Sequence, residues 1–525
     1  MAHRIATIVL QLGLIAVTIV VLPYRIFELD RYFVPKELAL HIVALAVAVI
    51  LVVRVMTMAL DAVDVVLLAF VALSLVSAVF ATNHWVAQRA LAITVSSAIV
   101  FWGGKQLGML GSHRAVLVGA AVATACAALT CLAQAYGLES DYFSLNRAPG
   151  GTFGNRNFVA HFCVIGLPSL VFATVTARRP LSALLGSVGA TIVAAALVLS
   201  RSRAAWLALA ACLVVIAVPL LASRGYWPHP HVGGRLARLA LAGVVGVAAA
   251  IALPNRLSWT SDSPYLDSAR GMVDYSSGSG RGRMAQYTNS LRMAGAHPVL
   301  GVGPGNWPVH YTRFARARDA SIAEDGMTAN PWPSSDWVAF ISERGFLATL
   351  ALAGAFVLLL WRGCRGWGDL PDGEAVLAKL VLIATLTTMA VVSAFDAVLL
   401  LPAPALLAWS VLGATSGVRG ERPGRVVTLP GTARNAVAAA TLMLLIVAVV
   451  RSVGQTAAIG FVGNGAMRAG WRNGVIWDPG SYRINLRLAQ LYAGRGDCPH
   501  ARVYARRAVR LFPAAPAPRR LVRCG

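Results

Sequence analysis

Long apolar blocks alternate with short polar connectors along most of the chain. The blocks are about 17–22 residues long, the length at which a helix crosses a bilayer. The first block follows Arg4 and lacks a small-residue cleavage site, so we interpret it as a helix and not as a removed signal peptide. The pattern predicts thirteen membrane spans, near residues 5–22, 37–53, 62–81, 90–104, 115–136, 158–177, 181–199, 204–222, 236–254, 337–361, 375–395, 397–417 and 435–455.

The composition fits the same class of protein. Of the 525 residues, 57% are hydrophobic and only 13% are charged, whereas a soluble chain carries about 25% charged residues. Soluble multi-domain, fibrous and disordered classes are therefore excluded. We expect an all-α, polytopic helical membrane bundle.

The net charge of +24 would indicate a nucleic-acid partner in a soluble protein. In a membrane protein, most of this positive charge is explained by the orientation of the chain in the bilayer. With the N-terminus in the cytoplasm, the inner loops are rich in basic residues and poor in acidic ones, which is the positive-inside bias. We therefore expect a cytoplasmic N-terminus, a periplasmic C-terminus and no nucleic-acid partner. The inner basic residues are Arg54, Lys105, Arg114, Arg178, Arg179, Arg224, Arg235, Arg238, Arg362, Arg365, Arg419, Arg422, Arg425 and Arg434.

Two long segments then face the periplasm. One is a loop over about residues 254–336, which is too long for a simple connector and is expected to cover the outer face as part of a functional site. The other is the tail after residue 455. We therefore divide the chain into a membrane domain, residues 1–455, and a periplasmic tail, residues 456–525.

The tail resembles one tetratricopeptide-like unit, two antiparallel helices with small residues where they cross. A generic helical hairpin is the alternative. The residues at the repeat spacing are Leu488, Ala489, Tyr492, Ala501, Ala508 and Pro513. Cys498 and Cys524 flank the hairpin, and we expect them to form a disulfide in an oxidising compartment. The other five cysteines have no metal-ligand spacing and are interpreted as packing residues.

No Walker loop, dinucleotide-binding glycine fingerprint, HExxH or CxxC motif occurs, so we expect no cofactor and no metal. The informative residues are arginines on the outer side. Arg201 and Arg203 separate two spans with almost no loop, and Arg281 and Arg283 open a helix-like segment of the large loop. Two arginine pairs in one compartment favour a clamp for a doubly charged anion. The alternative for the first pair is snorkelling to lipid headgroups.

A membrane enzyme with such a site and no nucleotide motif needs an activated substrate that already lies in the membrane. A polyprenyl-pyrophosphate-linked sugar fits this requirement. Its pyrophosphate is the leaving group, and arginines stabilise the developing charge without a metal.

Several motifs together resemble the bacterial O-antigen ligase and O-antigen polymerase superfamily over about residues 30–420. They are Gly151–Phe158 (GTFGNRNF), Ser200–Trp206 (SRSRAAW), Arg283 with Tyr287, His297–Trp307 (HPVLGVGPGNW), and Asp336-Trp337 leading to Glu343-Arg344-Gly345. The resemblance implies a protein of the bacterial inner membrane that performs metal-independent, inverting transfer of a glycan from undecaprenyl pyrophosphate to a periplasmic acceptor. That acceptor would be a lipid A core, a growing glycan or a protein. Related chains with tetratricopeptide tails include exopolysaccharide polymerases and protein O-oligosaccharyltransferases.

Carried over to this chain, Arg203 and Arg283 would bind the pyrophosphate, with Arg201 and Arg281 in support. The family's proposed base is a histidine, and Ser334 stands at its position here. Because an acceptor hydroxyl needs a proton acceptor within reach, we expect Asp336 to serve as the base.

His310 is a second candidate for substrate binding and proton transfer. The alternatives are that Asp336 caps a helix beginning at Trp337 and that His310 is a surface loop residue. A further alternative function is binding of lipid-linked glycans without transfer. The last alternative is a transporter, and only Asp396 and Lys379 indicate one.

Overall fold

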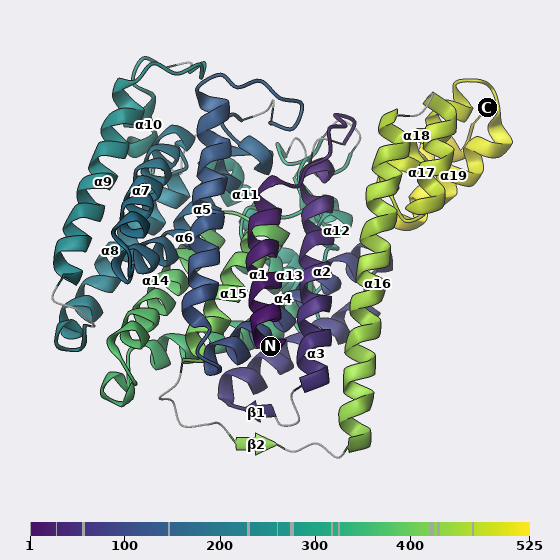
Figure 1. Ribbon diagram of the computed structural model, residues 1–525. Helices are drawn as coiled ribbons and strands as arrows, with labels where there is room; N and C mark the ends of the chain where they lie inside the picture. Colours follow the sequence, from purple (N-terminus) through teal and green to yellow (C-terminus); the bar gives the residue numbers. More distant parts are fainter. Residues whose placement is uncertain are drawn as a thin grey trace.

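The computed structural model describes residues 2–27, 29–54, 58–144, 147–227, 231–259, 261–272, 278–316, 319–323, 326–418, 425–427, 431–464 and 467–524. Two of the arginines assigned to inner loops, Arg419 and Arg422, lie outside these described residues. The described part is almost entirely helical (Figure 1).

Twelve described helices are long and apolar enough to cross a membrane. They are α1 (Ala2–Ile19), α2 (Asp30–Arg54), α3 (Ala62–Val79), α4 (His84–Met109), α5 (His113–Ala135), α6 (Arg156–Val175), α7 (Pro180–Ser200), α8 (Arg203–Ala222), α9 (Val232–Ala252), α13 (Asp336–Gly363), α14 (Gly373–Phe395) and α16 (Gly431–Asn464). Each corresponds to one predicted span. The all-α membrane bundle expected from the sequence is therefore confirmed.

The thirteenth predicted span, residues 397–417, has a different structure. Its helix, α15, covers only Pro402–Ser416, which at 1.5 Å per residue is about 22 Å and shorter than the hydrocarbon core. All fifteen of its residues are buried. Residues 397–401 precede it as a non-helical turn. The apolar run predicted the helix, but its length reflects burial inside the bundle.

The remaining elements lie in the connections and the tail. In the large loop are α10 (Pro264–Arg270), α11 (Gly278–Ala296) and α12 (Trp307–Phe314), and in the tail are α17 (Met467–Trp477), α18 (Tyr482–Ala493), α19 (Cys498–Leu511) and α20 (Pro516–Val522). Three short 3-10 helices cover Gly151–Phe153, Arg224–Tyr226 and Trp367–Asp369. Strands β1 (Met58–Leu60) and β2 (Arg425–Val427) form one small antiparallel pair.

The large loop and the tail meet at the same end of the bundle (Figure 1). Val309 of α12 packs in one apolar cluster with Tyr482 and Phe512 of the tail. The Asn83 side chain, at the start of α4, donates a hydrogen bond to the Leu511 carbonyl at 3.0 Å. Asn306 of the loop accepts a 2.8 Å hydrogen bond from the Asn83 backbone. The loop thus lies over one face of the bundle, with the tail against it.

The opposite end of the bundle contains a buried ion-pair cluster. Lys105 Nζ lies 2.5 Å from carboxylate oxygens of both Asp61 and Asp64, and Arg362 lies 2.6 Å from Asp61. Burial raises the pKa of Asp61, but hydrogen bonds from Arg362 and Lys105 outweigh that effect and lower it to about 2. Two basic residues assigned to separate inner loops therefore lie at one end.

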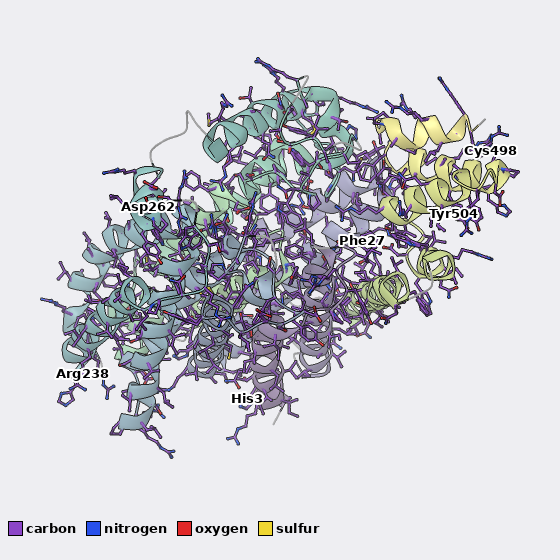
Figure 2. The ribbon with its side chains drawn as sticks, turned by 90° about the horizontal axis from the view of Figure 1, so that it is seen from above. His3, Phe27, Arg238, Asp262, Cys498 and Tyr504 are labelled. Atoms are coloured by element: carbon purple, nitrogen blue, oxygen red, sulfur yellow. A yellow bond between two sulfur atoms is a disulfide. The ribbon has the colours of Figure 1, made fainter. Side chains whose placement is uncertain are left out.

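The tail is a compact set of short helices beside the bundle. Figure 2 shows Cys498 and Tyr504 at one edge of the molecule, far from Arg238 at the other edge. Cys498 and Cys524 are joined by a disulfide with their Cα atoms 5.6 Å apart. Helices α18 and α19 form a hairpin. The resemblance of this hairpin to a tetratricopeptide unit stays a prediction. The boundary drawn at residue 455 falls inside α16, which runs without a break from the membrane region into the tail.

Candidate active site

The junction between α7 and α8 positions two of the predicted arginines. Arg201 has left-handed backbone angles (φ 52°, ψ 31°) and ends α7, while Ser202 and Arg203 begin α8. A non-glycine residue in this conformation costs about 1–3 kcal/mol and is concentrated at functional sites. The Arg201 side chain donates a 2.8 Å hydrogen bond to Ser268, and Arg203 donates one of 2.7 Å to the Gly271 carbonyl. The large loop thus fixes both guanidinium groups.

More positive charge gathers at this junction. The Arg201 guanidinium lies 4.5 Å from the ring centre of Trp259, and that of Arg156, at the start of α6, lies 5.4 Å from the same ring. Arg156 is within electrostatic reach of Arg147, Arg201 and Arg203. Burial lowers the pKa of Arg201, although Asp267 opposes the shift. A cluster of four arginines suits a ligand with more than one negative charge.

Arg283, from α11, approaches the same region through His161 of α6. His161 is 1% exposed, and its Nε2 lies 3.4 Å from Ser202 Oγ, beside Arg203. Arg283 and Asp396 are both within electrostatic reach of this ring. The structure therefore places Arg201 and Arg203 at the α7–α8 junction and Arg283, 80 residues after Arg203, within electrostatic reach of His161 beside that junction.

Arg281 does not share this position. Residues two apart on a helix point to different sides, and Arg281 is exposed whereas Arg283 is half-buried. Tyr287 follows Arg283 at the i+4 position, and its hydroxyl lies 2.7 Å from the Ser334 carbonyl and 2.8 Å from the Ala394 carbonyl. Tyr287 thus ties α11 to the segments before α13 and at the end of α14.

Asp336 lies in the core. Its side chain is 0% exposed, and its two carboxylate oxygens accept hydrogen bonds of 2.8–3.3 Å from the backbone N–H groups of Val398, Leu399 and Leu400. The cap of α13 is Ser335, whose hydroxyl accepts from the Val338 N–H, so the alternative that Asp336 caps a helix beginning at Trp337 is wrong. The Asp336 carboxylate instead holds the turn between α14 and α15.

Asp396 stands at the start of that turn and was not among the predicted site residues. It ends α14, and one carboxylate oxygen accepts a 2.9 Å hydrogen bond from the Ala397 N–H. Its side chain is half-buried, and it is within electrostatic reach of His161. The only signal in the sequence was an acidic residue between two apolar runs. Nothing in the sequence linked it to the arginines.

His310 lies on a different side of the loop from the arginine cluster. It is in α12 and 8% exposed, so the alternative of a surface loop residue is wrong. Its Nε2 lies 2.9 Å from Thr82 Oγ1, and its ring centre is 6.0 Å from that of His297. Burial lowers its pKa to about 4, with Arg313 and His297 adding to the shift. His310 is therefore a neutral ring near pH 7 that packs on the turn between α3 and α4.

The glycine-rich stretch after His297 is a docking turn. Gly301, Gly303 and Gly305 all have positive φ angles, and a side chain on Gly301 would approach the Glu343 backbone to 2.3 Å. Gly345 has φ 80° and kinks α13 at this contact. The Glu343 carboxylate accepts hydrogen bonds from the N–H groups of Gly305 at 2.8 Å and Trp307 at 3.1 Å. The positive φ angles, and at Gly301 the close approach to α13, therefore account for the three glycines.

Part of the chain is similar to a known protein family. A family model described as O-antigen ligase matches residues 188–353. That range contains all of Arg201, Arg203, Arg281, Arg283, His310 and Asp336, but neither His161 nor Asp396. No curated protein matches the chain.

The match supports glycan transfer at a membrane as the general function, with a lipid-linked glycan and an acceptor as substrates. Together with the twelve candidate spans among the described residues, it indicates a multi-pass protein of the inner membrane. Over residues 188–353 the chain is therefore similar to the O-antigen ligase family.

Proposed function

We propose that the protein transfers a glycan from undecaprenyl pyrophosphate to a hydroxyl acceptor on the periplasmic face of the inner membrane. The observation that carries this proposal is the arginine cluster at the α7–α8 junction, with Arg283 within electrostatic reach of His161 beside it. Arg203 and Arg283 both lie in the family-matched region. A pyrophosphate carries charge that spreads over several oxygens, and guanidinium groups bind such oxygens in pairs.

In this proposal the arginines act on the leaving group. Arg203 and Arg283 bind the pyrophosphate, and Arg201 and Arg156 supply further positive charge nearby. As the bond between the sugar carbon and the pyrophosphate oxygen breaks, negative charge grows on that oxygen. Fixed cations in a site with little water stabilise this charge. The acceptor oxygen attacks the opposite face of the sugar, so the configuration inverts.

The acceptor hydroxyl must also lose a proton. We assign that proton to the Asp396 carboxylate, which is half-buried and within electrostatic reach of His161, a neighbour shared with Arg283. Asp336, expected from the sequence as the base, becomes a positioning residue because its oxygens are already bound by the backbone of residues 398–400. It holds the turn that begins directly after Asp396.

We further propose a cytoplasmic N-terminus and a periplasmic tail. The disulfide between Cys498 and Cys524 supports this orientation because disulfides persist in the periplasm and not in the cytosol. The same site would serve a ligase, a polymerase or a protein glycosyltransferase. Only the acceptor separates these three, and a helical tail beside the loop suits a protein acceptor as well as a glycan.

The test uses purified protein, an undecaprenyl-pyrophosphate glycan, and lipid A core, oligosaccharide and protein acceptors in separate reactions. Arg203→Ala and Arg283→Ala are expected to lower turnover by about 10²–10³-fold, the loss typical of removing one group that stabilises transition-state charge. Arg281→Ala is the matched control, because this arginine is exposed on the same helix. Unchanged turnover in both site variants would refute the pyrophosphate clamp. Binding of the glycan lipid without product in the wild type would favour a non-catalytic binding role.

A further inference from the structure

A cavity of about 350 Å³ lies where the bundle, α16, the large loop and the tail meet. None of the predicted arginines, Arg201, Arg203, Arg281 and Arg283, is among the described residues that line it. It is therefore separate from the arginine cluster at the α7–α8 junction. Its volume is within the range of about 300–1,000 Å³ that small-molecule sites occupy.

The cavity is deep and mostly apolar. Along α4 its lining runs from Trp85 to Ala98, a distance of about 20 Å at 1.5 Å per residue. This is about two-thirds of the thickness of a hydrocarbon core. Aromatic and aliphatic side chains such as Phe70, Leu352 and Trp409 form its walls. A hydrocarbon chain matches this shape, whereas a sugar alone would leave the apolar walls wet.

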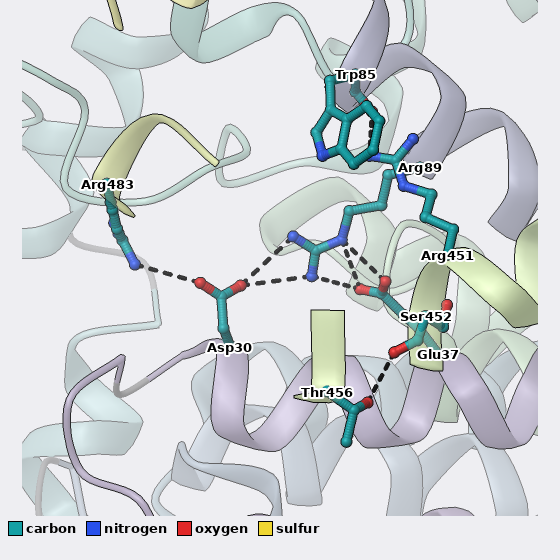
Figure 3. Close-up of polar contacts among 8 residues, drawn as sticks. All are labelled: Asp30, Glu37, Trp85, Arg89, Arg451, Ser452, Thr456 and Arg483. Atoms are coloured by element: carbon teal, nitrogen blue, oxygen red, sulfur yellow. Dashed lines mark hydrogen bonds and ion pairs between the residues drawn. The ribbon is translucent and has the colours of Figure 1, made fainter. Parts of the chain in front are cut away.

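The rim of the cavity is a network of paired charges (Figure 3). Arg89 of α4 binds Glu37 with contacts of 2.7–3.1 Å and Asp30 at 3.4 Å, and Arg483 of the tail lies 3.5 Å from Asp30. The Arg451 guanidinium of α16 lies 4.1 Å from the ring centre of Trp85. The carboxylates of Asp30 and Glu37 therefore have cationic partners. This network joins the tail to the bundle above the apolar walls.

Inside the rim, several buried polar atoms have no hydrogen-bond partner among the described residues. The clearest case is Arg344, which is 1% exposed: its Nη2 donates to Thr94 at 2.9 Å, but Nε and Nη1 have no acceptor in the described part of the chain. Both carboxylate oxygens of its neighbour Glu343 accept hydrogen bonds from backbone N–H groups of the glycine-rich turn instead. The rings of Phe340 and Phe70 lie 4.7 and 5.6 Å from the guanidinium. Their cation–π attraction offsets only part of the cost of burying these unbonded nitrogens.

The other unpaired atoms that line the cavity are Arg451 Nε, Ser97 Oγ, Thr328 Oγ1 and Gln455 Oε1. Each buried, unmade hydrogen bond costs about 1–3 kcal/mol. Native proteins leave few such atoms, and a group of them in one cavity indicates something that binds there. Because three of the unpaired atoms are guanidinium nitrogens, the missing partner must supply acceptors, preferably with negative charge.

We propose that this cavity binds a lipid with an acidic head group, whose chain lies on the apolar walls and whose phosphate or carboxylate oxygens accept from Arg344. The tail forms the roof of the site through Arg483 and Tyr482, which also line the cavity. The site is a second lipid site, additional to the arginine cluster at the α7–α8 junction. It does not depend on glycan transfer.

The test is native mass spectrometry of the purified full-length protein with three probes. These are dioleoyl phosphatidic acid, dioleoylglycerol with the same chains and no acid, and inorganic phosphate. We expect phosphatidic acid to bind at least 10-fold more tightly than either of the others. Equal affinity for dioleoylglycerol would overturn the acidic head group, and equal affinity for inorganic phosphate would overturn the lipid chain.

Variants separate this site from the rest of the protein. Arg344→Gln is expected to weaken phosphatidic acid binding at least 10-fold, and Ala90→Phe, on the cavity wall, to weaken it without removing a charge. Arg281→Gln, an exposed arginine outside the cavity, is the control. Full binding by both cavity variants would refute the site. Arg203→Ala is expected to lose transfer and keep this binding, so the two proposals fail independently.

Discussion

Replacing Asp336 by asparagine separates a catalytic base from a positioning residue. One Asp336 oxygen accepts from Val398 at 2.9 Å and Leu399 at 2.8 Å, and the other from Val398 at 3.1 Å and Leu400 at 3.3 Å. Asparagine keeps one acceptor oxygen and turns the second into an NH₂ donor. In the better of its two orientations, the Leu400 N–H then faces a donor and loses its partner.

The size of the effect follows from these contacts. An unsatisfied buried donor costs about 1–3 kcal/mol, and the two remaining hydrogen bonds lose the strength that a charged acceptor gives them. The lower cost of burying a neutral amide offsets part of this loss. We therefore expect Asp336→Asn to destabilise the protein by about 2 kcal/mol. The turn after Asp396 should loosen, and turnover should fall together with thermal stability.

The matched comparison is Asp396→Asn. Its side chain accepts a hydrogen bond from the Ala397 N–H at 2.9 Å and is half-buried. We expect this variant to lose turnover while its melting temperature in detergent stays close to that of the wild type. Both variants are measured by transfer assay and by thermal unfolding. An Asp336→Asn protein with unchanged stability and no turnover, beside an active Asp396→Asn protein, would refute the assignment and restore Asp336 as the base.

Three further outcomes test the fold around the site. Gly345→Ala should be destabilised by about 2 kcal/mol or more, because its φ is 80° and a side chain would approach the Val299 carbonyl oxygen to 2.1 Å; a normal yield and melting temperature would contradict the docked kink. Cys498→Ser should destabilise the tail by about 3–4 kcal/mol, because it opens the 26-residue loop that the disulfide to Cys524 closes. Limited proteolysis of the tail measures this loss. The pKa of His310 is lowered to about 4, so the folded state favours the neutral ring. The stability of the protein should therefore fall as the pH drops from about 6.5 towards 4. In thermal unfolding, His310→Gln should lose that part of the pH dependence.

Several features of the site followed from local sequence. Ser200–Arg203 places arginines between two apolar blocks that cannot be joined without a tight reversal, and the structure has that reversal at Arg201. The run Gly301–Gly305 is rich in glycine, which is typical of a turn, and its glycines have positive φ angles. The sequence also predicts the helix that carries Arg283 and Tyr287, and its helical period turns Arg281 away from Arg283.

Other features required contacts between distant parts of the chain. Asp336 binds the backbone 62–64 residues later, and nothing in its own neighbourhood distinguishes that role from a helix cap or a base. His161 and Asp396 were missed for the same reason, since one lies in an apolar span and the other ends one. The cavity around Arg344 has walls from α2, α3, α4, α13, α15, α16 and the tail. No single segment indicates it.

The sequence by itself determined the membrane class, twelve of the spans and the arginine motifs, because the bilayer imposes a length of apolar chain that each segment must satisfy alone. The tertiary structure decided the short, fully buried α15, the electrostatic interaction of Asp396 with His161, and the two guanidinium nitrogens of Arg344 that lack a partner among the described residues. These depend on which hydrogen-bond partners reach each buried group. In a helical bundle such partners come from other helices, whose packing is set by the whole chain.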